Sequence, residues 1–161
     1  MAASGLDTTD LRILEEVQKD GRISVVELSR RVHLTKTPCA ERLRRLEKSG
    51  VICGYFAKLN PMAVNAGHIV MVQVQLKGTT ADDLEAFNAA VVRSPEIQSC
   101  HMVAGGYDYL LKVRSKDIDA YRKILGEVIS KLPGVLQTHT YVVMETVKDE
   151  VTLPVASPRA W

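Results

Sequence analysis

The sequence predicts an α+β protein of two domains, and three observations support this fold class. Residues 7–49 hold three short amphipathic segments whose apolar side chains have helical spacing. Residues 69–147 follow the order strand, helix, strand, strand, helix, strand. Lys and Arg side chains concentrate in the N-terminal third of the 161-residue chain, which is long enough for two small domains. The two parts are therefore expected to differ in both structure and charge.

Capping residues mark the first two expected helices. Asp7, followed three residues later by Asp10, predicts a helix start, and Gly21 marks the end of that helix. Ser24 and Glu27 have the form of a capping box, in which each side chain binds the backbone N–H of the other residue. We expect a second short helix there.

The third expected helix has an apolar face and a charged face. Thr37 is placed to cap it, and Pro38 then takes the first helical position, where a missing N–H costs nothing. The apolar face consists of Cys39, Leu43 and Leu46. The opposite face consists of Glu41, Arg44, Arg45 and Lys48. Residues 51–56, with Gly54 at or near the turn, predict a small hairpin after this helix.

The second half of the chain predicts a ferredoxin-like βαββαβ domain, an antiparallel sheet with both helices on one face. The expected elements are a strand at 69–77, a helix capped by Thr80, a strand at 97–103, a strand at 107–113, a long helix from Ser115 and Asp117 to Leu132, and a strand at 135–147. The uncovered face would expose aliphatic side chains such as Ile69 and Met71, so association is expected.

These patterns divide the chain into four stretches. We expect a helical domain at 1–60, a linker at 61–66, the βαββαβ domain at 67–150 and a tail at 151–161.

Composition excludes several classes of protein. The longest apolar run, Ile69–Val72, is too short to cross a bilayer, and no signal peptide opens the chain, so a cytoplasmic protein is expected. Three cysteines at unrelated spacings fit neither a disulfide framework nor a zinc cluster, and the four histidines have no metal-like spacing. No catalytic triad, phosphate-binding loop or dinucleotide motif is present, so neither an enzyme nor a cofactor is expected.

The charge distribution indicates an anionic partner for the N-terminal domain. Residues 22–58 carry nine Lys or Arg and three Glu, a net charge of +6, whereas the rest of the chain has a net charge of −4. Three helices and a hairpin form the outline of a winged helix-turn-helix, whose third helix enters the major groove of DNA. Arg44, Arg45 and Lys48 would then hold phosphates, while Thr35, Lys36 and Thr37 would reach base edges.

Taken together, these segments resemble the Lrp/AsnC family of bacterial and archaeal regulators, and most of all its leucine-responsive branch. The resemblance spans residues 6–149 and rests on Asp10–Leu14, Leu28–Val32, Thr37–Cys39, Arg42–Leu46, Gly50–Tyr55, Gly105–Val113, Leu132–Val135 and Thr140–Met144. It implies a winged helix-turn-helix joined to a RAM domain, which forms dimers and often octamers. It also implies an amino-acid effector that binds near the contact between dimers. The location that it implies is the bacterial cytoplasm, where the protein would be associated with the nucleoid.

The residue patterns and the resemblance together give two candidate sites. The DNA-binding candidates are Thr35, Lys36, Thr37, Pro38, Glu41, Arg42, Arg44, Arg45 and Lys48. The effector-binding candidates are His101, Gly105, Gly106, Tyr107, Asp108 and Tyr109. The sequence departs from many members at Lys36, where they have proline, and this departure bears on the operator sequence rather than on the fold.

Asp108 is the sharpest effector candidate. Its carboxylate would pair with the α-ammonium of an amino acid, while N–H groups beside Gly105 and Gly106 would receive the α-carboxylate. The alternative is an ordinary turn aspartate that binds its own backbone. Two other functions stay open at this point, a small enzyme on the βαββαβ domain and a ligand-sensing adaptor that has lost DNA binding.

Overall fold

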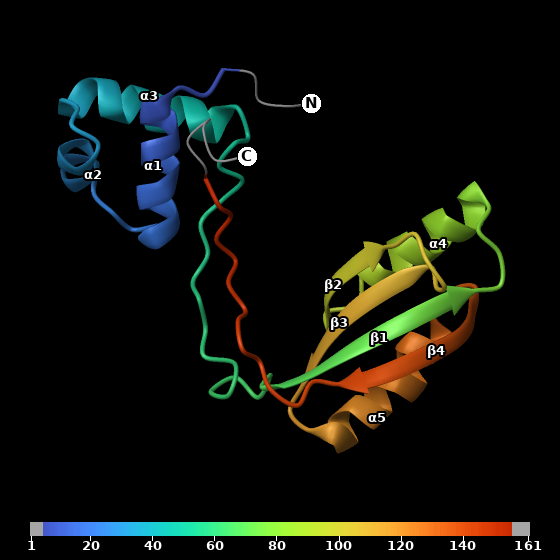
Figure 1. Ribbon diagram of the computed structural model, residues 1–161. Helices are drawn as coiled ribbons and strands as arrows, with labels where there is room; N and C mark the ends of the chain where they lie inside the picture. The colour runs from blue at the N-terminus through green and yellow to red at the C-terminus, as the bar shows by residue number, and fades with distance from the viewer. Residues whose placement is uncertain (1–4, 156–161) are drawn as a thin grey trace. The chain divides into compact units, whose positions relative to one another are not determined.

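The computed structural model describes residues 5–155, which form two compact units (Figure 1). Among the described residues, the first unit holds 5–58 together with the segment 148–155. The second unit is Leu59–Val147. The sequence did not predict that the C-terminal segment belongs to the first unit.

The N-terminal unit contains three helices, of which the first two begin at the predicted caps. These helices are α1 at Thr8–Lys19, α2 at Val25–Arg31 and α3 at Lys36–Lys48. The Asp7 side chain accepts from the N–H groups of Thr9 and Asp10, and Asp10 accepts from the Asp7 N–H at 3.1 Å, which completes a capping box.

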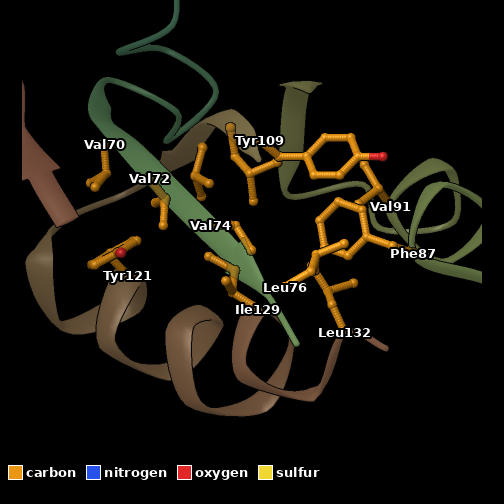
Figure 2. Packing of buried hydrophobic residues seen from close by; sticks show 12 residues of the cluster. Val70, Val72, Val74, Leu76, Phe87, Val91, Tyr109, Tyr121, Ile129 and Leu132 are labelled. Atoms are coloured by element: carbon orange, nitrogen blue, oxygen red, sulfur yellow. The ribbon is translucent and has the colours of Figure 1, made fainter. Parts of the chain in front are cut away.

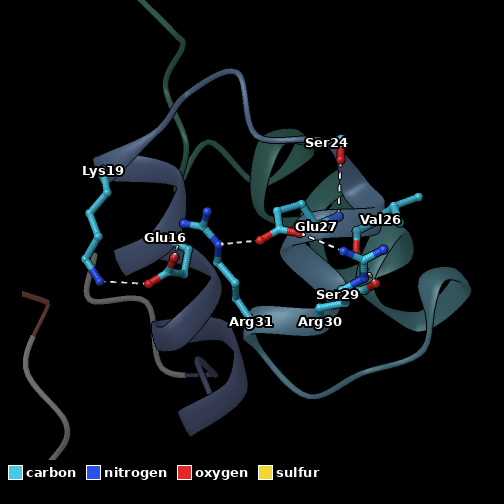
Figure 3. Close-up of polar contacts among 8 residues, drawn as sticks. All are labelled: Glu16, Lys19, Ser24, Val26, Glu27, Ser29, Arg30 and Arg31. Atoms are coloured by element: carbon cyan, nitrogen blue, oxygen red, sulfur yellow. Dashed lines mark hydrogen bonds and ion pairs between the residues drawn. The ribbon is translucent and has the colours of Figure 1, made fainter.

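Only half of the capping box predicted for α2 is formed. Ser24 accepts from the Glu27 N–H at 3.1 Å, as expected. The Glu27 carboxylate, however, turns to the guanidinium groups of Arg30 and Arg31 on the same helix, at 3.2 and 3.0 Å (Figure 3). Charge-assisted hydrogen bonds to arginine are stronger than one to a neutral backbone N–H, so the carboxylate is drawn away from the cap.

The start of α3 lies two residues before the position predicted. Thr35, not Thr37, is the N-cap residue, and its side chain forms no capping hydrogen bond. Pro38 is therefore the third helical residue rather than the first. It is still tolerated, because the first four N–H groups of a helix have no partner within the helix.

The hairpin expected at residues 51–56 is absent from the structure, which assigns no strand to residues 51–60. The first part of the segment packs on the helical core through Val51 and Ile52, and the Ile52 N–H donates to the Leu46 carbonyl at 3.1 Å. Beyond it, Phe56 is 74% exposed. A two-stranded hairpin with no surface to pack against is marginally stable in water, which explains why the pattern alone does not form one.

The second unit has the predicted βαββαβ order. Its elements are β1 at His68–Leu76, α4 at Ala81–Val92, β2 at Ile97–Met102, β3 at Tyr109–Ser115, α5 at Ile118–Glu127, a 3-10 turn η1 at Ile129–Lys131 and β4 at Val135–Val142. The four strands form one antiparallel sheet in the order β2-β3-β1-β4.

Several boundaries in this unit differ from the prediction, and β3 begins at Tyr109 rather than at residue 107. The long helix expected up to Leu132 ends at Glu127 and continues only as η1. Asp117 caps α5, whereas Ser115 belongs to β3. β4 stops at Val142, which is in register with Val70, and one further hydrogen bond runs from the Val143 N–H to the Ile69 carbonyl at 3.0 Å, close to the start of β1 at His68.

The core of this unit lies between the sheet and its two helices (Figure 2). Val70, Val72 and Val74 of β1 are fully buried, and the rings of Phe87 on α4 and Tyr109 on β3 lie 4.4 Å apart between centroids. The opposite face is more polar than predicted. It presents His101, Leu110, Gln73 and His139 side by side across the four strands, as their register shows.

Candidate nucleic-acid interface and ligand-binding loop

A buried carboxylate holds the helix proposed to bind DNA. Asp10 of α1 is completely buried, and its Oδ1 accepts from Arg42 at 2.9 Å while its Oδ2 accepts from Arg45 at 2.6 Å. Arg42 also donates to Asp7 at 2.5 Å, and this hydrogen bond, after the one from the Asp10 N–H, lowers the pKa of Asp7. The guanidinium groups of Arg42 and Arg45 are therefore tied to the start of α1.

Sequence analysis overlooked this role of Asp10, although a signal was present. Asp10, Ile13 and Val17 have the spacing of one helical face, and all three are buried. A carboxylate on an apolar face must have a cationic or hydrogen-bonding partner, because burying an unpaired charge is very costly. Arg42 and Arg45, both predicted to contact DNA, are the partners.

The other cations of α3 have no such partner. Lys36, Arg44 and Lys48 are exposed, and none of their side chains forms an ion pair or hydrogen bond within residues 5–155. Arg44, Arg45 and Lys48 line one shallow hollow on the outer side of α3, together with Glu41 and Ser49. The structure thus gathers most of the predicted charged face in one place.

The leading end of α3 is accessible as predicted. Thr35, Lys36 and Thr37 are exposed and Pro38 is half-buried. The apolar side of the helix packs inward, with Cys39 at 0% and Leu46 at 1% exposure. Burial raises the pKa of the Cys39 thiol, which suits a packing role rather than a reactive one.

An ion-pair network joins α1 to α2 beside this helix (Figure 3). The Glu16 carboxylate accepts from Lys19 at 2.7 Å on its own helix and from Arg31 at 2.9 Å on α2. The hydrogen bonds from Lys19 and then Arg31 lower the pKa of Glu16. The Glu16–Arg31 ion pair connects α1 to α2, and Arg31 also binds Glu27 on its own helix.

The predicted effector loop connects β2 to β3 and is anchored by Asp108. The Asp108 Oδ2 accepts from the Leu76 N–H at 2.7 Å, and the Asp108 N–H donates to the Val74 carbonyl at 3.0 Å. The Asp108 carbonyl accepts from the Val103 N–H at 3.0 Å. The carboxylate therefore has a structural role at the end of β1, and its Oδ1 is the oxygen left for another partner.

The remaining effector candidates do not all gather at this loop. Gly105 and Gly106 are exposed at its tip, and Tyr107 is half-buried beside Asp108. Tyr109 belongs instead to the core, at 2% exposure. His101 is exposed on β2 and pairs in register with Leu110, so it faces away from the helices.

Neither packing nor backbone conformation within the chain requires glycine at the tip of the loop. A Cβ added to Gly105 or Gly106 would meet nothing within 4 Å, and neither residue has the positive φ that favours glycine.

Comparison with known proteins assigns the family. Residues 6–52 match a model described as a winged helix-turn-helix DNA-binding domain, and residues 69–153 match the Lrp/AsnC ligand binding domain. The leucine-responsive regulatory proteins of Salmonella typhimurium and Escherichia coli K12 are each 57% identical to the chain over 143 residues, covering 89% of the chain and 87% of each relative. The chain belongs to the Lrp/AsnC family.

Solved structures agree with this Lrp/AsnC assignment. A transcriptional regulator from Neisseria meningitidis, crystallised as an L-Met complex, has 35% identity and a TM-score of 0.88, covering 93% of this chain and 97% of that chain. An AsnC family regulator from Agrobacterium tumefaciens has 31% identity and a TM-score of 0.89, with the same coverage. The predicted α+β architecture of a helix-turn-helix and a βαββαβ domain is confirmed.

The Lrp/AsnC regulator is accordingly a DNA-binding transcription factor with a ligand-binding domain. The enzyme alternative is set aside, because its relatives are transcriptional regulators. Within residues 5–155, no helix is long and apolar enough to span a bilayer. The described part of the chain also has no cluster of three or more His, Cys, Asp or Glu side chains that could hold a metal ion.

Proposed function

We propose that the protein binds double-stranded DNA through the outer face of α3 and that an amino acid bound at the β2–β3 loop modulates this binding. The observation that carries the proposal is the set of unpaired cations on α3. Lys36, Arg44 and Lys48 are exposed without a partner among residues 5–155. Phosphate contacts by such side chains release counterions, so affinity falls as salt concentration rises.

Removing Arg44 or Lys48 tests the DNA-binding face. Each change to Ala should weaken binding to specific and random duplexes alike and make the slope of log affinity against log salt shallower by about one. Fluorescence anisotropy at four salt concentrations measures this slope. Arg122→Ala is a matched control, because Arg122 is 79% exposed on α5 in the other unit. Unchanged slopes for both α3 variants would show that other residues contact the phosphates, and a parent protein that binds no duplex would favour the adaptor that has lost DNA binding.

The exposed loop tip supports binding of a small molecule. Nothing within the chain requires glycine at 105 and 106, but a missing Cβ lets a ligand or a second subunit approach the backbone. The Neisseria relative was crystallised with L-Met, which is a small apolar amino acid. A neutral or apolar amino acid is therefore the effector that we propose, with its ammonium group near the Asp108 Oδ1.

Asp108→Asn tests this part of the proposal. Asparagine keeps an oxygen that can accept from the Leu76 N–H, so the fold should persist while the charge beside the ligand is lost. A thermal-shift screen of the twenty amino acids identifies the best ligand, and calorimetric titration compares the two proteins. We expect weaker binding by Asp108→Asn and unchanged binding by Asp119→Asn on α5. Equal affinity for Asp108→Asn and the parent would make Asp108 a turn residue only.

We also propose that the second unit drives assembly into dimers and larger oligomers. β4 and the residues after it expose large apolar side chains, namely Leu136 near the start of the strand, Tyr141 and Val142 at its end, and Met144 and Val147 beyond it. A fragment comprising residues 59–150 should sediment as a dimer or larger. A monomer at micromolar concentration would contradict this expectation. Binding to DNA would place the oligomer at the nucleoid in a bacterial cytoplasm.

A further inference from the structure

Arg45 differs from its neighbours on α3 because it is both anchored and accessible. Its side chain is 56% exposed and lines the same hollow as Arg44 and Lys48. One terminal nitrogen nevertheless donates to the buried Asp10 carboxylate at 2.6 Å. A guanidinium has five N–H groups in a fixed plane, so one edge can bind a carboxylate while the others bind a second anion.

Asp10 is held firmly enough to orient a side chain. It is 0% exposed, and three donors reach it from Arg42, Arg45 and the Asp7 N–H. Arg42 is used differently, because the same nitrogen serves both Asp7 and Asp10, and its side chain is only 30% exposed. Of the two arginines that bind Asp10, Arg45 is therefore the one with donors turned toward the outer face of α3.

We propose that Asp10 is a positioning residue, which fixes the Arg45 guanidinium so that its outer N–H groups meet a DNA phosphate. The inference rests on the proposed DNA-binding face. An arginine already held in place loses less conformational freedom when it binds than an unrestrained one does. Arg44 has no partner among residues 5–155, so it acts as a simple flexible cation.

Lysine substitutions separate the two arginines. The lysine head group is a single compact ammonium, which cannot bridge Asp10 and a phosphate as a guanidinium does. Arg45→Lys should therefore lose nearly as much affinity for a random duplex as Arg45→Ala, about tenfold at low salt. Arg44→Lys is the matched control and should stay within about twofold of the parent, because the charge alone is what it supplies.

Asp10→Asn supplies a second, opposite-signed test. Removing a negative charge beside DNA should tighten binding if Asp10 only neutralises Arg45, but should weaken binding if Asp10 orients Arg45. Combining Asp10→Asn with Arg45→Ala forms a double-mutant cycle, in which Asp10→Asn should have no further effect once Arg45 is gone. Asp7→Asn is the control, because it removes a charge from the same helix start without contacting Arg45.

The salt series of fluorescence anisotropy decides between the outcomes, with circular dichroism and sedimentation reporting that each variant is folded. If Asp10→Asn fails to fold, the Arg45→Lys and Arg44→Lys comparison decides alone. Parent-like affinity of Arg45→Lys, or tighter binding by a folded Asp10→Asn, would overturn the inference while leaving the proposed function intact. Undiminished binding by both Arg44→Ala and Arg45→Ala would reject the proposed DNA-binding face, and this inference with it.

Discussion

Asp108 and Tyr109 are adjacent in the chain but have opposite surroundings. Asp108 lies half-buried at the base of a loop, with its carboxylate bound to the Leu76 N–H. Tyr109 points into the core, and its hydroxyl has no hydrogen-bond partner of standard geometry among the described residues, although the Asn88 side chain lies near it. Burial raises the pKa of Tyr109, and the same burial makes an unpaired hydroxyl costly.

The lone hydroxyl leads to a prediction at residue scale. Tyr109→Phe should leave the free energy of unfolding unchanged or raise it by up to about 1 kcal/mol, because a buried unpaired polar atom is removed. Tyr109→Ala should lower it by about 3 to 5 kcal/mol, because the ring that packs on Phe87 is lost. Urea titration measures both values. A clear loss in Tyr109→Phe would mean that a water molecule or a second subunit pairs with the hydroxyl.

At the scale of single elements, the first helical position of α3 has a backbone conformation that can hold proline. Thr35 has extended backbone angles, with φ −78° and ψ 160°, and Lys36 is the first helical residue. Proline is favoured at a first helical position, and the residue before proline prefers extended backbone. A proline at this position would therefore fit the same backbone without strain.

Lys36→Pro should consequently preserve the fold and change DNA sequence preference. We expect the melting temperature to hold or rise slightly, since proline restricts the unfolded chain. The ranking of operator variants should change more than the affinity for random DNA, because Lys36 lies at the exposed leading end of α3. Competition binding with a set of operator variants measures this, and Lys36→Met controls for the lost charge. A uniform loss across all variants would identify Lys36 as a phosphate contact.

The joint between α1 and α2 should depend on pH through Glu16. Hydrogen bonds from Lys19 and Arg31 lower the pKa of Glu16, so its contribution to stability is present above the unfolded-state pKa near 4.5 and is lost as pH falls through the lowered folded value. Glu16→Gln should melt below the parent at pH 7, and the difference should shrink as the pH drops below 4.5. Calorimetric melts from pH 7 to 3 measure it. A difference that persists at pH 3 would rule out the ion pairs as its cause.

At the scale of the whole molecule, the chain passes twice between its two units, because the C-terminal segment returns to the N-terminal one. The side-chain amide of Gln18 on α1 makes two hydrogen bonds to the backbone of Leu153. It accepts from the Leu153 N–H at 2.7 Å and donates to the Leu153 carbonyl at 3.1 Å. The Leu153 side chain itself is 74% exposed. The contact with Gln18 is therefore made by the backbone of Leu153 and does not depend on the Leu153 side chain.

Backbone attachment predicts an unusual mutational pattern for the tail. Leu153→Pro removes the N–H that donates to the Gln18 side-chain oxygen, so it should release the C-terminal segment from α1. Leu153→Ala keeps this N–H and should leave the segment bound to α1. A net hydrogen bond contributes about 0.5 to 1.5 kcal/mol, so the protease-sensitive population should rise several-fold in the proline variant. Limited proteolysis of the tail measures this. Equal sensitivity of the two variants would point to the side chain instead.

Much of the local structure could be predicted because it depends on neighbouring residues. The caps Asp7, Thr80 and Asp117 lie at helix starts as expected, and the alternation in β1 predicted its buried face. The accessible cations Arg44 and Lys48 followed from helical spacing alone. These features need only the sequence within one or two turns, or one strand, of each residue.

The candidate sites were predicted less completely because partners from distant parts of the chain decide them. Arg42 and Arg45 have the same local appearance as Arg44, but Asp10, more than thirty residues away, binds only the first two. Asp108 is likewise engaged by the end of β1, across the sheet. Helical spacing tells which way a side chain points, not which opposite charge will meet it.

The sequence by itself determined the order of the elements, the division into a basic helical domain and a βαββαβ domain, and the family resemblance, since each rests on patterns that repeat within short stretches. Only the tertiary structure decided that residues 51–60 form no strand, that β4 ends at Val142 and that the tail returns to α1. The physical reason is common to all three. Backbone hydrogen bonds of an extended segment need a partner elsewhere in the chain, and its own residues cannot specify whether that partner is in reach.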